Sequence, residues 1–84
     1  MVIIITESQY YARLICKAKD IDRDGFVYVN DPYGLHGYDR DTPVIVFNPF
    51  YKASVHRAHM KAKERFDNIQ VLRDVDRIEE DREV

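Results

Sequence analysis

The sequence predicts a single small α/β domain: a mostly parallel sheet of three or four strands with two main helices, in a Rossmann-like or P-loop-like topology. Two observations predict this class. Short runs of β-branched and aromatic residues alternate with two stretches of helical periodicity. Two of the runs are apolar without interruption, which is typical of strands buried on both faces of a parallel sheet. With 84 residues, the chain is expected to form an α/β domain over residues 1–73 and a charged tail over residues 74–84.

The first part of the chain is predicted to form a strand, a helix and a second strand. The run VIIIT at residues 2–6 is the first strand. Ser8 then caps a helix that ends near Lys19. The segment FVYVN at residues 26–30 is the second strand. On the expected helix, one apolar face is formed by Tyr11, Leu14, Ile15 and Ala18.

The second part adds a loop, a third strand, a second helix and a fourth strand. Residues 31–43 hold two prolines and two glycines, which indicates a loop or a short helical turn. The run PVIVFN at residues 43–48 is the third strand, the helix covers residues 51–67, and IQVL at residues 69–72 is the fourth strand. One side of this helix is expected to carry Tyr51, Val55, Ala58, Ala62 and Phe66.

Composition removes several classes of function. The formal net charge of −2 gives no global attraction to nucleic acid or to a membrane surface. The single Cys16 excludes an internal disulfide framework and a cysteine-rich zinc site. The amino-terminal segment lacks the basic region and long apolar core of a signal peptide, and no apolar run approaches the ~20 residues that cross a bilayer. We therefore expect a cytoplasmic protein with no membrane contact and no cofactor.

Two segments resemble RecA-like ATPase domains of helicases and phage terminases. Residues 2–20, VIIITESQYYARLICKAKD, are similar to the unit in which a threonine ends a strand and a helix follows. Residues 34–48, GLHGYDRDTPVIVFN, are similar to the approach to the Walker B strand. The chain has no G-x-x-x-x-G-K-[ST] phosphate loop, and Asn48 stands where the Walker B acid would lie, so we expect no ATP hydrolysis and no enzyme. As a small α/β chain, it is also similar to accessory proteins of bacteriophages, which often bind a host protein.

The stretch KDIDRDGFVYVNDP has the spacing of a calcium loop. Asp20, Asp22, Asp24 and Asp31 match acidic positions of an EF-hand, and Gly25 matches its bend. The other interpretation is a turn between helix and strand, in which Gly25 takes a positive φ. In that interpretation the strand carries Asp31 about 13 Å away from Val27, at about 3.3 Å per residue, so Asp31 cannot close a loop around Asp20. The position of Asp31 therefore decides between the two.

The loop at residues 31–41 is the predicted recognition surface. Tyrosine and arginine anchor many protein interfaces, and loops beyond the carboxyl ends of strands are the usual binding edge of such sheets. We predict a non-enzymatic binding or regulatory protein that uses this loop and the adjoining second helix. The alternative is that the same side chains close the core. The predicted partner-binding residues are Tyr33, Leu35, His36, Tyr38 and Arg40.

The second helix supports an alternative function, which is nucleic-acid binding. A basic helix face is a common way to contact phosphates. The other interpretation is a solvated face balanced by the acidic tail. His56 and His59 are three residues apart and could share a metal ion, although two imidazoles alone make a weak site. A sheet edge left half-exposed is compatible with a homodimer. The cations of this segment, residues 52–65, are Lys52, Arg57, Lys61, Lys63 and Arg65.

Overall fold

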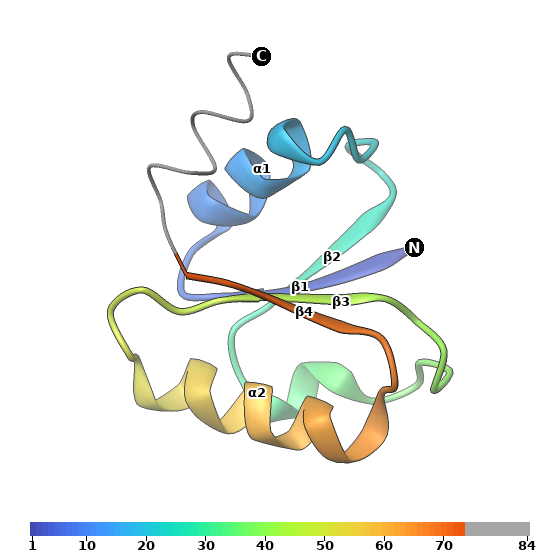
Figure 1. The fold of residues 1–84 in the computed structure, drawn as a ribbon, viewed down its shortest axis with the longest axis vertical. Coiled ribbons are helices and arrows are strands. Elements are labelled where there is room, and N and C mark those ends of the chain that lie inside the picture. The colour runs from blue at the N-terminus through green and yellow to red at the C-terminus, as the bar shows by residue number, and fades with distance from the viewer. Residues whose placement is uncertain (74–84) are drawn as a thin grey trace.

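A four-stranded, all-parallel sheet forms the centre of the protein, with helices on both of its faces (Figure 1). The computed structural model describes residues 1–73, and the predicted tail lies outside the described residues. The elements are β1 (Val2–Thr6), α1 (Gln9–Ala18), β2 (Phe26–Val29), the 3-10 helix η1 (Pro32–Leu35), β3 (Val44–Phe47), α2 (Ala53–Arg65) and β4 (Ile69–Leu72). The predicted α/β class is confirmed, and the number of strands in the described part is four.

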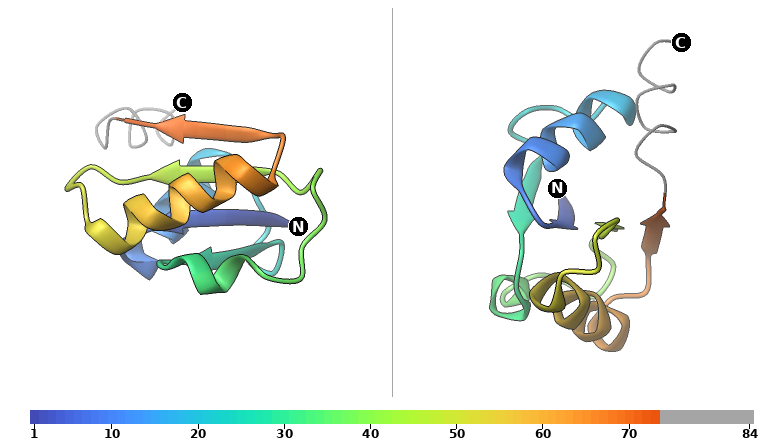
Figure 2. Two further views of the ribbon diagram at one scale, coloured as in Figure 1. Left: turned by 90° about the horizontal axis from the view of Figure 1, so that it is seen from below. Right: turned by 90° about the vertical axis from the view of Figure 1, so that its left-hand side faces the viewer.

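The strand order is β2-β1-β3-β4, so β1 pairs with both β2 and β3. Figure 2 shows α1 on one face of the sheet, and η1 and α2 beside each other on the other face. This is a doubly wound, Rossmann-like arrangement, in which the direction of winding reverses between β1 and β3. Ile3, Ile4 and Ile5 of β1 are fully buried, as the uninterrupted apolar run predicts for a central parallel strand.

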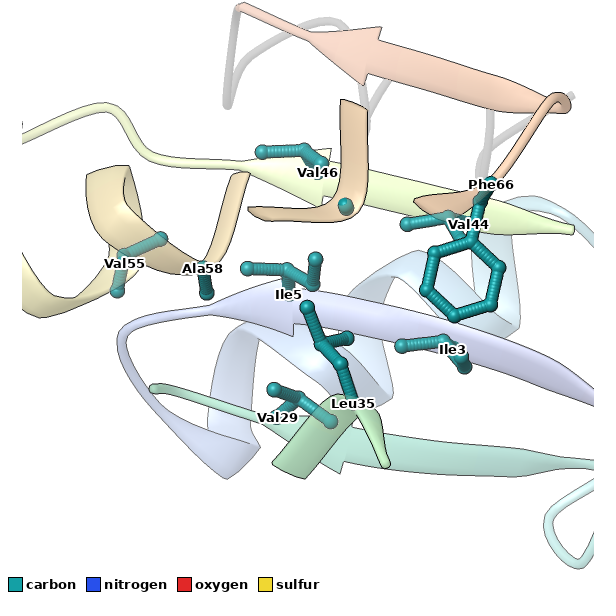
Figure 3. Packing of buried hydrophobic residues seen from close by; sticks show 10 residues of the cluster. Ile3, Ile5, Val29, Leu35, Val44, Val46, Val55, Ala58 and Phe66 are labelled. Atoms are coloured by element: carbon teal, nitrogen blue, oxygen red, sulfur yellow. The ribbon is translucent and has the colours of Figure 1, made fainter. Parts of the chain in front are cut away.

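The face under α2 holds the larger buried cluster (Figure 3). Ile3 and Ile5 of β1 pack there with Val44 and Val46 of β3, and the small residues of α2 let the helix lie close to them. The predicted helix side is confirmed at Val55, Ala58, Ala62 and Phe66, which are all buried. The prediction is wrong for Tyr51, which precedes α2, has a φ of 54° and is 84% exposed.

The face under α1 holds a second buried cluster, centred on Ile4 and Phe47. The predicted cap is confirmed, since the Ser8 hydroxyl accepts a hydrogen bond from the Tyr11 N–H at 3.4 Å. The Tyr11 ring then packs edge-on against Phe47, with 5.4 Å between the ring centres. In the described part of the chain, neither helix is long and apolar enough to cross a membrane.

Thr6, the last residue of β1, is fully buried, and within residues 1–73 its hydroxyl has no hydrogen-bond partner. A buried hydroxyl without a partner destabilises the folded state. We therefore expect Thr6→Val, which keeps the branched shape, to raise the free energy of unfolding by about 1 kcal/mol in urea denaturation. Thr42→Val, at a half-buried threonine in a loop, is the control and should give no such gain. A loss of stability in Thr6→Val would show that the hydroxyl is hydrogen-bonded.

Candidate functional site

The acidic stretch begins as the end of α1. The Ile21 N–H donates to the Cys16 carbonyl at 2.9 Å, and the Asp20 N–H donates to the Lys17 carbonyl at 3.4 Å. These two bonds form a Schellman motif, whose central residue must be left-handed. Asp20 takes that conformation, with a φ of 56°, and Ile21 packs into the cluster under α1. Asp20 therefore ends the helix.

The remaining aspartates are not brought together. The Gly25 N–H donates to the Asp22 carbonyl at 2.9 Å and closes the turn, but Gly25 is not among the positive-φ residues, so that prediction is wrong. β2 then pairs with β1, and Asp31 lies beyond its far end, where its Oδ1 accepts from the N–H of Tyr33 and caps η1. Among the described residues, no group of three or more His, Cys, Asp or Glu could hold a metal ion. The stretch is a turn and a strand, and the EF-hand-like arrangement is absent from it.

The 3-10 helix η1 is anchored to the core by Leu35, which is fully buried against β2, β1 and α2 (Figure 3). The prediction that Leu35 binds a partner is therefore wrong, because its side chain does not reach the surface. Gly34 permits the close approach, since a Cβ there would lie 3.0 Å from Cγ1 of Val29. Tyr38 is half-buried and packs against the same cluster. Tyr33 lies on the outer side of η1 and is 81% exposed.

A groove runs between η1 and α2, with a volume of about 500 Å³. We call it the η1–α2 groove. It brings the predicted loop and the predicted second helix together, as the sequence indicated. Arg40 lies elsewhere, because its Nε contacts the Asp67 carboxylate at 3.2 Å. The groove is lined by Pro32, Tyr33 and His36 from the loop and by Arg57, Met60, Lys61 and Glu64 from α2.

The η1–α2 groove combines positive charge with exposed apolar surface. Arg57 and Lys61 line its α2 side, and Glu64 is the one acidic side chain among the described residues that line it. Met60, which is 48% exposed, was not predicted; its signal in the sequence is an apolar residue outside the buried side of the helix. Arg65 Nη1 donates to Nδ1 of His36 at 3.4 Å and ties the end of η1 to α2.

The basic residues of α2 do not form one face. Arg57 and Lys61 line the η1–α2 groove, whereas Lys63 lies on the opposite flank of the helix, toward β4. Lys52 precedes α2, and its N–H donates to Oδ1 of Asn48 at 2.9 Å. The predicted set of five cations is therefore divided over both flanks of the buried side of the helix.

Asn48 and Cys16 are residue types that could suggest catalysis, but both have structural roles here. Asn48, at the place of the Walker B acid, holds the start of α2, since its Nδ2 also donates to the Lys52 carbonyl at 3.3 Å. Cys16 is buried on α1, and burial raises the pKa of its thiol, which disfavours the nucleophilic thiolate. No protein-family model, curated protein or solved structure matches the chain.

Proposed function

We propose that the protein is a non-enzymatic binding protein that takes an acidic segment of a partner protein in the η1–α2 groove. The observation that carries this proposal is the exposed pair Tyr33 and Met60 beside the cations Arg57 and Lys61. Aromatic and thioether side chains supply apolar contact area at interfaces, and arginine supplies directed hydrogen bonds. Together they fit a partner segment that carries both acidic and apolar side chains.

The contacts that hold η1 in place support binding without a large ordering cost. Asp31 caps η1, Gly34 lies against Val29, and Leu35 fixes η1 to the core. Because these three contacts fix η1, the backbone that carries Tyr33 is already ordered before a partner binds. Contacts made by a preordered surface lose less conformational entropy on binding than contacts made by a mobile loop.

The charge distribution supports an acidic partner. The whole chain has a formal net charge of −2, yet this groove presents Arg57 and Lys61 against a single Glu64. Opposite charges across an interface accelerate encounter and select against partners of the wrong sign. The resemblance to bacteriophage accessory proteins supports a host protein as this partner, and the unpaired Cys16 supports a reducing, cytoplasmic setting.

Site-specific photo-crosslinking in the native host tests the proposal. A benzophenone amino acid in place of Tyr33 is expected to form a covalent adduct with a partner protein, whereas the same group in place of exposed Tyr10 on α1 is not. Arg57→Glu combined with Lys61→Glu should reduce the adduct by about tenfold or more, because it reverses both charges. Arg13→Glu with Lys17→Glu is the matched control, since these exposed cations have the same spacing on α1.

The identity of the crosslinked species also shows whether something other than an acidic partner protein occupies the η1–α2 groove. A crosslinked species that disappears with nuclease would assign the groove to nucleic acid and overturn the proposal. A crosslinked dimer of the chain itself would assign the groove to a second copy. An adduct that survives charge reversal would contradict the acidic character of the partner.

A further inference from the structure

A second groove lies on the opposite flank of α2, between this helix and β4. Figure 2 shows β4 at the edge of the sheet, beyond α2. A cavity of about 290 Å³ opens there at the carboxyl ends of β3 and β4, and a second hollow of about 390 Å³ continues it past His59. We call the two together the α2–β4 groove. The carboxyl edge is where open α/β sheets bind ligands, and this groove is one strand away from the reversal point between β1 and β3.

The walls of the α2–β4 groove have two chemical characters. Its apolar side is formed by Val46 of β3 and Val71 of β4. His56 and His59 come from α2 and lie one turn apart, because residues three apart share a helix face. Arg73, directly after β4, lines both hollows together with His59. Groups that can carry positive charge therefore enter the groove from two elements.

Among residues 1–73, few acidic groups line this groove. Of the described residues that line the first hollow, none is acidic. Lys63 adds a cation in the second hollow, and Asp67 lines the same hollow. The Asp67 carboxylate is paired with Arg40, at 3.2 Å from its Nε. The groove therefore favours an anion.

We propose that the α2–β4 groove binds a small organic phosphate monoester, with its apolar body against the two valines and its phosphate between His56, His59 and Arg73. A phosphate monoester carries about −1.5 to −2 charges at pH 7 and three strong acceptor oxygens, which match two imidazoles and a guanidinium. A carboxylate offers one charge and would use fewer of these donors. A transition metal ion needs further protein ligands, and no group of three or more exists in the described part of the chain.

The protonation of His59 links binding to pH. Its pKa is lowered, first by desolvation and then by Lys63 and His56, so His59 is mostly neutral at pH 7 when the groove is empty. Among residues 1–73, two charged groups from outside α2 line the second hollow with His59: the cation Arg73 and the carboxylate of Asp67, which is paired with Arg40. A bound dianion favours the protonated ring and raises the His59 pKa. Binding therefore takes up a proton and tightens as the pH falls from 8 toward 6.5; below about pH 6 the ligand itself loses charge.

NMR titration of the full-length protein with phenyl phosphate tests this inference. The chain has three histidines, and His36 lies in the other groove, so its ring is an internal control. We expect saturable shifts of the His56 and His59 rings, a dissociation constant on the order of 1 mM and a raised His59 pKa. His59→Gln and Arg73→Gln should each weaken binding about tenfold, and Arg13→Gln on α1 should leave it unchanged. Thermal melts of each variant confirm that it is folded.

Four results would overturn the inference. Shifts that stay linear to high concentration, or that are equal at His36, would show non-specific binding. Benzoate binding as tightly as phenyl phosphate would show that the groove does not select a dianion. Inorganic phosphate binding as tightly would show that the apolar wall contributes nothing. Failure here leaves the partner-protein proposal intact, because Arg57 and Lys61 lie on the other flank of α2.

Discussion

Replacement of Phe47 by alanine is expected to lower the free energy of unfolding by about 3–5 kcal/mol. Phe47 ends β3, is fully buried under α1, and packs edge-on against Tyr11 at 5.4 Å. Its removal leaves a cavity between α1 and the sheet, because the surrounding strands can close in only partly. Domains are stabilised by about 0.05–0.15 kcal/mol per residue, so for a chain of this size the loss is a large share of the total.

Urea denaturation followed by circular dichroism measures this change through the midpoint and slope of the transition. Phe50→Ala is the matched control, because this ring also faces Tyr11, at 6.3 Å, yet it is 60% exposed. Its removal should lower the free energy of unfolding by about 1 kcal/mol or less. Equal losses in the two variants would contradict the packing of Phe47 as the centre of this cluster.

Replacement of Leu35 by alanine is expected to cost about 2–5 kcal/mol of unfolding free energy and to release η1 from the core. Leu35 is the side chain through which η1 contacts the cluster under α2 (Figure 3). Tyr33→Ala, two positions earlier, removes an 81% exposed ring and should change stability by about 0.5 kcal/mol or less. The two variants therefore distinguish the role of Leu35, which holds η1 in place, from that of Tyr33, which is proposed to contact the partner.

Hydrogen exchange resolves the difference between these variants. In Leu35→Ala, the amide of Gly34, which donates to the Asp31 carboxylate at 3.3 Å, should lose protection before the sheet does. In Tyr33→Ala this protection should remain. Wild-type protection of η1 in Leu35→Ala would show that other contacts hold this segment, and partner binding would then not depend on the anchor.

Local signals in the sequence predicted most elements of the fold. β1 and β4 have the predicted bounds, and the Ser8 cap forms as expected, because strand runs and helix caps depend on neighbouring residues. No local pattern predicts the strand order β2-β1-β3-β4, because this order arises from pairing between distant segments. The same limit explains Tyr51: its spacing continues the buried side of α2, but the helix begins only at Ala53.

The candidate site was predicted in part. Tyr33 and His36 lie beside α2, as the loop-and-helix hypothesis required. Leu35 was misassigned because the burial of one turn of 3-10 helix depends on what it packs against, and the sequence of the loop does not show this. The α2–β4 groove was missed because Arg73 and His59 meet only when β4 pairs with β3.

The central position of β1 has a consequence for the order in which the chain can fold. β1 is made before the other strands of the sheet, yet it completes its pairing only when residues 44–47 are available on its other edge. At about 5–20 residues per second of synthesis, the 41 residues from Glu7 through Phe47 take roughly 2–8 s. During that time a run of three isoleucines, buried in the finished protein, lacks one of its two neighbours. The nascent domain is therefore most exposed to aggregation at β1, where chaperones would act with the greatest effect.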